Sequence, residues 1–349
     1  MAPYLRECLE QLHKQSCNSA EFIVVDDGST DESKQICDEY QANDSRFKVI
    51  HLPKNQGLLR VRKIGIEHSS GRYLIFLDGD DYLSSTESLN HLIHTMGIAN
   101  CDIGGFPVTV FGIDDSRCKS MLQHLSFERA GTFTSSLDIL QAIYGEHSVM
   151  SWTIWNKCYQ SKVLKEAVKV IPNEHIVMAE DAFLVFIFAC CSECFKVLNI
   201  PPVTNYRLGT GVSTRFPTTA EQFKVVAKTV RVIRLLQRIS KVKKLSTIHA
   251  VLIERTLFQL LRNTLYAWQA LPNKDKPKAF EYILMEGFYN ETLRTAIDMF
   301  SNSKSNLLEV MEGTSNFINS LHKRGKETQP YYKRITHILR KLFHVIRAR

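Results

Sequence analysis

The sequence has no run of about 18 or more consecutive apolar residues, the length that a membrane-spanning helix needs. The residues after Met1 also lack the apolar stretch of a secretory signal. We therefore expect neither a transmembrane helix nor a secretory leader. The nine cysteines are scattered, and their odd number argues against a disulfide framework. A reducing, cytoplasmic location is the simplest expectation.

Metal-binding patterns of cysteine and histidine are missing as well. Cys191 and Cys194 have no second pair to complete a four-ligand structural zinc site, and the 12 histidines form no metalloprotease motif. The composition, 44% hydrophobic and 23% charged, is ordinary for a globular protein. A net charge of +8 suits a nucleotide phosphate or an anionic membrane surface as partner. We do not expect a nucleic-acid partner.

The first part of the chain alternates between strand-like and helix-like hydrophobic patterns. Short strands that alternate with helices of ten to fifteen residues indicate βαβ units. We therefore predict an α/β fold with a mostly parallel sheet flanked by helices. The strands are expected at 21–25, 47–52 and 72–77, and the helices at 3–14, 31–41 and 57–68.

The pattern changes towards the C-terminus. Residues 112–130 are expected to be rich in loops, and short strands are expected at 195–199 and 203–206. Nearly everything beyond that point has helical period. We place a domain boundary near residue 215, between an α/β domain (1–215) and a helical region (216–349).

Three carboxylates, Asp78, Asp80 and Asp81, directly follow the apolar run at 72–77. Ligands bind at the strand ends of open α/β sheets, and clustered carboxylates repel each other unless a cation neutralises them. Mg²⁺ or Mn²⁺ takes oxygen ligands and is often shared with substrate phosphates. The cluster therefore predicts a divalent metal site for a diphosphate-bearing substrate. A plain acidic turn is the alternative.

A second acidic pair, Asp26 and Asp27, follows the expected strand at 21–25. Carboxylates in such positions accept hydrogen bonds from a ribose or a base. The alternative is a solvated turn whose polar residues cap the next helix. If both acidic clusters end strands of one parallel sheet, they converge on one edge, and this coincidence favours the functional interpretation of both.

Basic residues form a third group of candidates. Arg60 and Arg62 open the helix at 57–68, and both a helix N-terminus and a guanidinium suit a phosphate or a nucleobase carbonyl. A solvent-facing basic surface is the alternative. Arg207, after the strand at 203–206, is a candidate for binding a diphosphate, against a simple exit turn.

Two further segments have both a functional and an ordinary interpretation. Glu180 and Asp181 begin an otherwise apolar helix, where acids complement the helix dipole. A carboxylate in this apolar setting is also suited to act as a general base toward a hydroxyl. Trp152 and Trp155 lie three residues apart, either as core residues or as surfaces for a sugar ring.

Taken together, these motifs resemble the family-two glycosyltransferases with the GT-A fold, of the kind that builds bacterial polysaccharides. The similarity covers about residues 1–215 and is carried by the stretches 23–31, 55–57, 76–81, 155–157 and 180–181. It implies a nucleotide-sugar donor, a divalent metal (Mg²⁺ or Mn²⁺), a glycan or lipid-linked acceptor in surface polysaccharide synthesis, and inversion at the anomeric carbon.

The resemblance also assigns roles to individual residues. Asp181 is the implied catalytic base, and Asp80 and Asp81 are the implied metal ligands. The implied donor-binding residues are Asp26, Asp27, Arg62 and Asp78, and the further candidates for the acceptor or the diphosphate are Trp155 and Arg207.

Members of this family begin with a strand that ends in a nucleotide-contacting turn, whereas this sequence begins at the helix that follows. The resemblance therefore implies that the first strand is absent and that activity is weak or absent. A nucleotide-sugar or glycan binder without catalysis is thus an alternative. A nucleotidyltransferase is a third interpretation, although we find no glycine-rich phosphate loop near the start.

The segment 331–349 has six basic residues, no acidic residue, and apolar residues at helical spacing. This pattern predicts a basic amphipathic helix that contacts an anionic membrane peripherally, at the inner face of the cell membrane. The alternative is a helix that packs on its own domain and exposes its basic face to solvent.

Overall fold

The computed structural model describes residues 1–112, 114–127, 130–211, 217–242, 245–300 and 302–323. By contacts, the chain divides into two compact units, Met1–Thr214 and Arg215–Arg349. Each is described by itself. In the described parts of the chain, we find no helix with the length and hydrophobicity to span a bilayer. The basic helix predicted at 331–349 lies outside the described residues.

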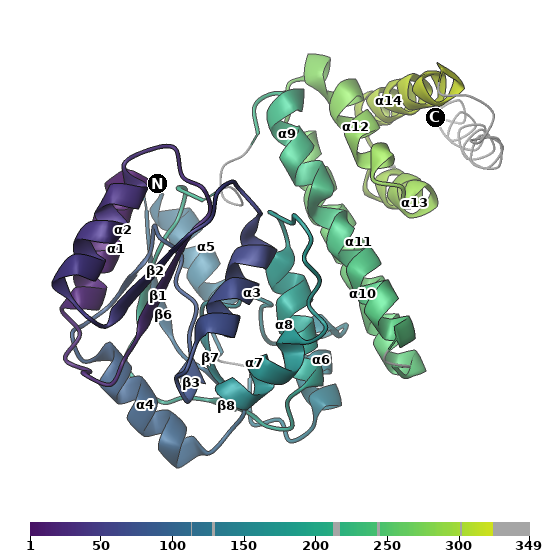
Figure 1. Cartoon of the computed structure of the whole chain (residues 1–349). Coiled ribbons are helices and arrows are strands. Elements are labelled where there is room, and N and C mark those ends of the chain that lie inside the picture. The colour runs from purple at the N-terminus through teal and green to yellow at the C-terminus, as the bar shows by residue number, and fades with distance from the viewer. Residues whose placement is uncertain (113, 128–129, 212–216, 243–244, 301, 324–349) are drawn as a thin grey trace. The chain divides into compact units, whose positions relative to one another are not determined.

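The first unit begins with a two-stranded parallel sheet and three helices. These elements are α1 (Ala2–His13), β1 (Phe22–Asp26), α2 (Ser33–Asn43), β2 (Phe47–His51) and α3 (Leu58–His68). The register of β1 and β2 places Asp26 beside His51. Figure 1 shows α1 and α2 on one side of this sheet and α3 on the other. The sheet thus carries the first acidic pair at its edge, beside the helix that bears Arg62.

The rest of the first unit contains two mixed sheets. One has the order β3 (Tyr73–Leu74), β7 (Lys157–Gln160), β5 (Ile103–Gly105), β8 (Phe195–Val197), and the other β4 (Tyr82–Leu83), β9 (Thr204–Arg207), β6 (Val108–Phe111). The expected parallel pairing holds for β1–β2, β5–β8 and β6–β9. Among the named strands of the described residues, the three antiparallel pairs each involve β4 or β7, which the sequence pattern did not predict. The predicted α/β class is confirmed, and the sheets are mixed rather than mostly parallel.

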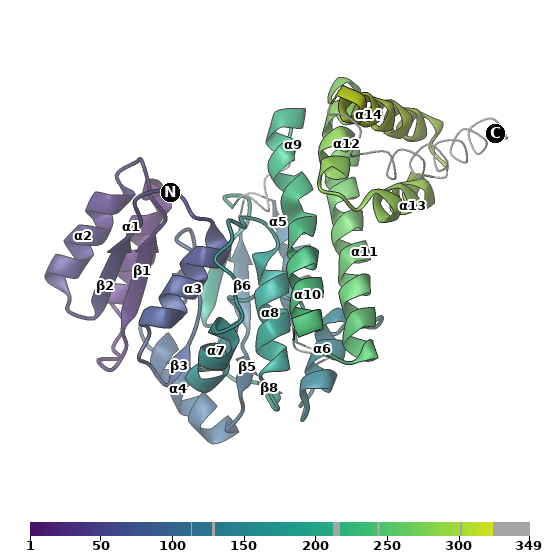
Figure 2. The ribbon, with the colours of Figure 1, turned by 45° about the vertical axis from the view of Figure 1, so that its right-hand side comes forward.

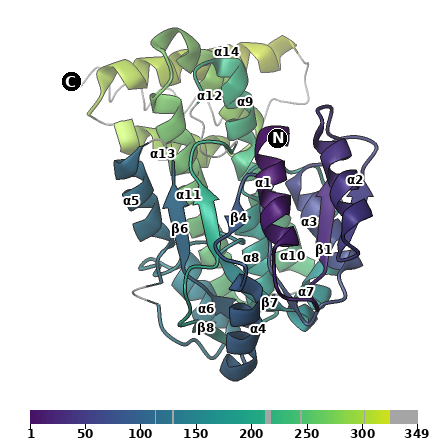
Figure 3. The same ribbon diagram turned by 90° about the vertical axis from the view of Figure 1, so that its left-hand side faces the viewer.

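Five helices cover these sheets. They are α4 (Ser88–Ala99), α5 (Asp115–Leu125), α6 (Ser136–Tyr144), α7 (Ser161–Val168) and α8 (Glu180–Cys190). Helices α7 and α8 continue the layer that begins with α3 (Figure 2), and α5 packs against β6 (Figure 3). Helix α8 is apolar on every side after its first two residues, which is typical of a helix enclosed by other elements.

Two local predictions were wrong. Residues 112–130 are not mainly loop, because Asp114 caps α5 by accepting hydrogen bonds from the amides of Ser116 (2.9 Å) and Arg117 (3.1 Å). The strand predicted at 72–77 forms a ladder only over Tyr73–Leu74, where β7 runs beside it. Helices α6 and α7 were also not predicted. Both are short, and α7 has no side-chain cap, whereas the start of α6 is marked by Ser135, which accepts a hydrogen bond from the Asp138 amide at 3.1 Å.

The second unit is helical, as the period beyond residue 216 predicted. Its helices are α9 (Ala220–Ala227), η1 (Lys228–Val230), α10 (Arg231–Val242), α11 (Thr247–Gln269), η2 (Asn273–Asp275), α12 (Lys276–Met285), α13 (Tyr289–Phe300) and α14 (Lys304–Lys323). Trp268 is fully buried against Phe280 and Phe300, and its ring N–H donates to the Lys276 carbonyl oxygen at 2.8 Å. This indole anchors α11 to α12 and α13.

Gly28 follows β1 with φ at +70°, a conformation that side chains rarely adopt. An added Cβ would lie 2.7 Å from the carbonyl carbon of Lys54. We expect Gly28→Ala to lower the free energy of unfolding by about 1–3 kcal/mol, measured by urea denaturation. The control is Gly97→Ala in α4, where a Cβ would meet nothing within 4 Å. This control should be neutral or stabilising by up to about 1 kcal/mol. Equal midpoints for the two variants would contradict the expectation.

Candidate active site

Arg62 of α3 lies at the centre of the candidate site and is only 8% exposed. Its Nη1 donates to Glu180 Oε1 at 2.7 Å and also to Asp181 Oδ1, and its Nη2 donates to Asp78 Oδ1 at 3.2 Å. These three carboxylates come from two separate segments, the turn after β3 and the start of α8. One guanidinium therefore joins the predicted base to a predicted donor-binding residue.

Burial sets the protonation of the two α8 acids. It raises the pKa of Glu180 and of Asp181, and the positive charge of Arg62 opposes this rise without cancelling it. The Asp181 side chain remains 18% exposed, whereas that of Glu180 is 7% exposed. Asp181 also accepts a hydrogen bond from the Ile154 amide at 3.3 Å. Of the pair, Asp181 is therefore the more accessible proton acceptor.

Asp27 fixes the turn that leads into α3. Its Oδ1 accepts from the Gln56 amide at 2.6 Å, and its Oδ2 accepts from the Gly57 amide at 2.9 Å. Gly57 has φ at +83° and immediately precedes α3. Asp27 thus connects the end of β1 to the helix that carries Arg62.

Asp26 is buried at the end of β1, with two hydrogen-bond partners. It accepts from the Ser29 amide at 3.0 Å and lies 2.9 Å from His51 Nδ1. Burial alone would raise its pKa, but the bonds from Ser29 and His51 outweigh burial and lower it. His51 in turn reaches Asp38 at 2.8 Å, and Asp38 first and Asp26 second raise the pKa of this histidine. Asp26 is therefore held as a carboxylate.

The three aspartate side chains of the acidic turn after β3 contact three different partners. Asp78 bonds to Arg62, Asp80 Oδ2 accepts from the Thr210 hydroxyl at 2.6 Å, and Asp81 Oδ1 accepts from the Arg207 amide at 2.8 Å. The three carboxylates do not converge on one point. Across the described residues, no group of three or more histidine, cysteine, aspartate or glutamate side chains is placed to hold a metal.

Asp81 is the least accessible acid of this turn, at 1% exposure. Its Oδ2 is buried and finds no hydrogen-bond partner within the part of the chain that the structure describes. Burial, reinforced by Asp78 and Asp80, raises the pKa of Asp81 to about 8, against the opposing bond from the Arg207 amide. A buried carboxylate oxygen without a partner is costly, so this atom favours an added proton or cation.

Arg207 is committed to contacts within the protein. Its Nε donates to the Asp80 carbonyl oxygen at 3.1 Å, and its Nη2 donates to Glu7. The guanidinium also lies over the rings of Phe111, at 4.6 Å, and Tyr4, at 5.0 Å. The structure therefore gives Arg207 a clear role in holding α1 against the acidic turn.

Trp155 is 5% exposed and stacks on Tyr206, with ring centroids 4.4 Å apart and an interplanar angle of 13°. Burial raises the pKa of Tyr206, and the nearby acids Asp81, Asp78 and Asp80 add to this rise. The stack therefore adjoins the acidic turn, and most of the Trp155 surface is occupied by protein.

The structure thus joins most of the residues that the sequence singled out. Arg62, Asp78 and Asp181 form one chain of contacts, and Asp80, Asp81 and Arg207 form a second. Asp27 holds the backbone turn that precedes the helix of Arg62. The amide of Asp81 donates to the carbonyl oxygen of Asp78 at 3.0 Å and joins the two chains. Asp26 lies next to Asp27 but contacts Ser29 and His51 instead.

Sequence reasoning missed three residues of this site. They are His51, Ile154 and Tyr206. A parallel pairing of the two predicted strands would have placed His51 at the strand end beside Asp26. Ile154 and Tyr206 contribute a backbone amide and a buried ring, for which the sequence holds no distinct signal.

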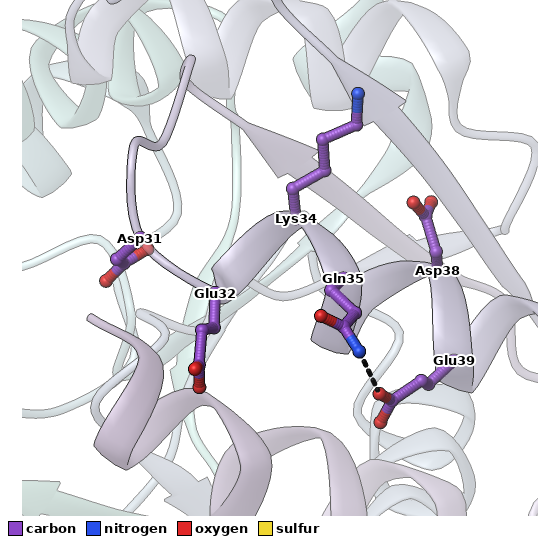
Figure 4. Close-up of a pocket in the computed structure, with 6 residues that line it drawn as sticks. All are labelled: Asp31, Glu32, Lys34, Gln35, Asp38 and Glu39. Atoms are coloured by element: carbon purple, nitrogen blue, oxygen red, sulfur yellow. Dashed lines mark hydrogen bonds between the residues drawn. The ribbon is translucent and has the colours of Figure 1, made fainter.

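A surface hollow of about 500 Å³ lies elsewhere, at the start of α2. Figure 4 shows its lining, in which Gln35 donates to Glu39 at 3.3 Å. The lining residues are Asp31, Glu32, Lys34, Gln35, Asp38 and Glu39. A lining with four carboxylates and one amine would repel an anionic nucleotide, which argues against a donor site in this hollow.

Comparison with known proteins identifies the family of the N-terminal part. Residues 2–154 match the family model described as Glycosyl transferase family 2. The putative glycosyltransferase EpsH of Bacillus subtilis is 49% identical over 80 residues, which are 23% of this chain and 23% of that protein. The cholesterol galactosyltransferase of Borreliella burgdorferi is 30% identical over 212 residues, 58% of each protein. The chain thus spans less than two thirds of the length of these relatives.

A solved structure resembles the chain over most of its length. The crystal structure of S. aureus TarS residues 1–349 in complex with UDP-GlcNAc has a TM-score of 0.56 and covers 90% of this chain and 88% of that one. The sequences are 17% identical, so the likeness shows a shared fold. The predicted GT-A-like fold, followed by a helical C-terminal region, is confirmed.

Removal of the positive charge of Arg62 tests how far the stability of the site depends on that charge. We expect Arg62→Met to lower the free energy of unfolding by about 3–5 kcal/mol at pH 8, because the buried Glu180 and the mostly buried Asp181 then lose their cationic partner. The loss should be smaller at pH 5. Burial holds the pKa of Glu180 and Asp181 above that of an unfolded chain. The folded state therefore binds more protons, and its stability falls as the pH rises above the ordinary carboxyl range.

The matched control is Arg60→Met on the same helix, whose guanidinium reaches Asn173. We expect it to change the free energy of unfolding by less than about 1 kcal/mol. Urea denaturation at pH 5 and pH 8 measures both variants. An Arg62→Met loss that is independent of pH, or no larger than the loss in the control, would refute the role of Arg62.

Proposed function

The chain carries a glycosyltransferase family 2 domain over residues 2–154, and on that premise we propose that it transfers a sugar from a nucleotide-sugar donor to an acceptor hydroxyl. The observation that carries the proposal is the ion-pair cluster in which Arg62 joins Asp78 to Asp181. The contact of Asp27 with the turn before α3 extends this cluster to the first acidic pair. Arg62 thus joins Asp78 to the candidate base through side chains, and Asp27 is connected to Arg62 through the backbone at the start of α3.

We propose that Asp181 is the catalytic base. Its carboxylate takes the proton of the acceptor hydroxyl while that oxygen attacks the anomeric carbon from the side opposite the nucleotide. The sugar–phosphate bond breaks, the nucleoside diphosphate leaves with the electron pair, and the configuration inverts. Burial raises the pKa of Asp181, which makes the carboxylate a better proton acceptor. The bonds from Arg62 and the Ile154 amide fix its orientation.

We propose that Asp26, Asp27 and Asp78 bind the donor together with Arg62. Asp26 is a carboxylate at a strand end, which suits hydroxyl or base N–H donors. Asp78 is the most exposed of the acids in the cluster, at 38% of its side chain. UDP-GlcNAc is the first nucleotide sugar to test as donor, because the similar TarS structure is a complex with this compound.

A divalent cation, Mg²⁺ or Mn²⁺, is part of the proposal. The carboxylates of Asp80 and Asp81 have the donor chemistry that such ions prefer, and the buried Oδ2 of Asp81 has no partner in the described structure. We propose Asp80 as the main protein ligand, with Asp81 beside it. When bound, the ion would stabilise the leaving diphosphate as a Lewis acid.

The remaining assignments are proposals of the same kind. A glycan or lipid-linked acceptor in surface polysaccharide synthesis is supported by the bacterial relatives, one of which is named a cholesterol galactosyltransferase. The basic amphipathic sequence at 331–349 supports peripheral contact with the inner face of the membrane. Contact of Trp155 or Arg207 with acceptor or diphosphate would require both residues to leave their present protein contacts.

A second candidate is a nucleotide-sugar binder that does not transfer the sugar. The observation that favours it is the direct pairing of Asp181 with Arg62, which occupies one oxygen of the proposed base.

We expect Asp181→Asn to lower kcat about 10²–10⁴-fold with little change in the KM for the donor, because the amide cannot accept the proton. The assay measures nucleoside diphosphate release from a panel of nucleotide sugars with Mg²⁺ or Mn²⁺, and EDTA tests the cation. Asp138→Asn is the control. It removes a carboxylate from the first turn of another helix, α6, and should keep the full rate.

The outcomes separate the candidates. Saturable donor binding by calorimetry without diphosphate release would indicate the binder, and release of pyrophosphate would indicate a nucleotidyltransferase. Full activity of Asp181→Asn would contradict its role as base, and activity that EDTA leaves unchanged would contradict the metal.

A further inference from the structure

Lys157, at the start of β7, is a fully buried cation that the proposed reaction does not use. Its Nζ donates to the carbonyl oxygens of Ser151 (3.0 Å) and Thr153 (2.7 Å) and to Asn156 Oδ1 (2.8 Å). An ammonium group has three N–H donors. In the protonated form of Lys157, all three are therefore used by groups of the six residues that precede it.

These residues, 151–156, belong to neither a helix nor a strand, so no regular ladder pairs their backbone. Hydroxyls complete the network: Ser151 Oγ lies 2.7 Å from Thr153 Oγ1, which donates to Asn156 Oδ1 at 2.8 Å. Buried carbonyl groups without a partner are costly. The ammonium of Lys157 therefore supplies the bonds that allow this turn to be buried in its present shape.

The turn holds groups of the candidate site in place. The Ile154 amide donates to Asp181 Oδ2 at 3.3 Å, and Trp155 stacks on Tyr206. The Ile154 carbonyl oxygen accepts from the Tyr159 hydroxyl at 3.3 Å. A shift of the turn would therefore move a direct partner of the proposed base.

Burial of this charge is costly. It lowers the pKa of Lys157 to about 7, and the opposite charge of Asp181 only partly opposes this. The imidazole of His124 is the other titratable group that senses the ammonium; burial and then Lys157 lower the pKa of His124. An apolar side chain of similar length would fill the same space without this cost, so packing alone does not account for a lysine here.

We propose that Lys157 is a positioning residue for Asp181: its ammonium holds the turn at 151–156 so that the Ile154 amide bonds to the Asp181 carboxylate. Its importance for sugar transfer rests on the proposed function, whereas its effect on the turn does not.

The direct test is amide hydrogen exchange at Ile154, measured at residue level by mass spectrometry with electron-transfer fragmentation. We expect Lys157→Met to speed this exchange by about tenfold or more, since the turn loses three hydrogen bonds. The control is Lys196→Met, which removes an ammonium that donates to the Ala99 carbonyl oxygen at 2.8 Å, and should leave Ile154 unchanged. Exchange at Ile154 that is equal in Lys157→Met and wild type would overturn the proposal.

A second variant covers the case in which Lys157→Met does not fold. Lys157→Gln keeps two N–H donors and should speed the exchange at Ile154 less than the loss of all three would. In the wild-type chain the Ile154 amide should already exchange more slowly than an amide in an open loop. Free exchange at Ile154 in the wild type would refute the proposal without any variant.

A measurement of activity then separates the role of Lys157 from the proposed function. In an active preparation, Lys157→Met should lower kcat about tenfold or more and leave the donor KM within about twofold, because only the base is misplaced. An equal fall in kcat for Lys196→Met would remove the specific role. If the wild type releases no diphosphate from any donor, the proposed function fails, and hydrogen exchange still decides the role of Lys157.

Discussion

The ion pairs of the Arg62 guanidinium are the interaction on which the candidate site depends. Its partner Glu180 is buried and its partner Asp181 is mostly buried, at 18% side-chain exposure, and two such carboxylates are stable side by side only with a cation between them. Because Arg62 lies on α3 while its partners lie after β3 and on α8, the same charge also fixes how these segments meet. Stability and the placement of the proposed base therefore depend on one side chain.

Hydrogen bonds from backbone amides fix the orientation of two carboxylates of the candidate site. Asp27 holds the turn that starts α3, and the 151–156 turn presents the Ile154 amide to Asp181. Each such bond contributes about 1.5–3 kcal/mol net, the range for a hydrogen bond to a charged group. Their value lies in geometry, because each restricts a carboxylate to one orientation. Lys157 acts on the backbone in a similar way, because its buried ammonium bonds to carbonyl oxygens of the 151–156 turn and restricts the shape of that turn.

Much of the fold could be predicted from the sequence, and the exceptions have physical causes. The amphipathic helices α1 and α3 have a clear period, and β1 and β2 are short apolar runs followed by polar residues, so the predicted bounds of these elements were close. Strands β4 and β7 have two and four residues, too few for a period to show, and they changed the sheet from mostly parallel to mixed. Five candidate acids were found because they follow expected strands, and Asp181 because it begins an otherwise apolar helix. Their partners were not, since Arg62–Asp181 and Lys157–Ser151 depend on tertiary packing and backbone groups.

A double-mutant cycle between Arg62→Met and Asp181→Asn tests the central claim most directly. The free energies of unfolding of the wild type, both single variants and the double variant are measured at pH 8, where the carboxylates that Arg62 pairs should be charged. If the guanidinium holds Asp181 in place, the two substitutions are coupled by about 2 kcal/mol or more. Additive effects, with a coupling below about 0.5 kcal/mol, would contradict the account.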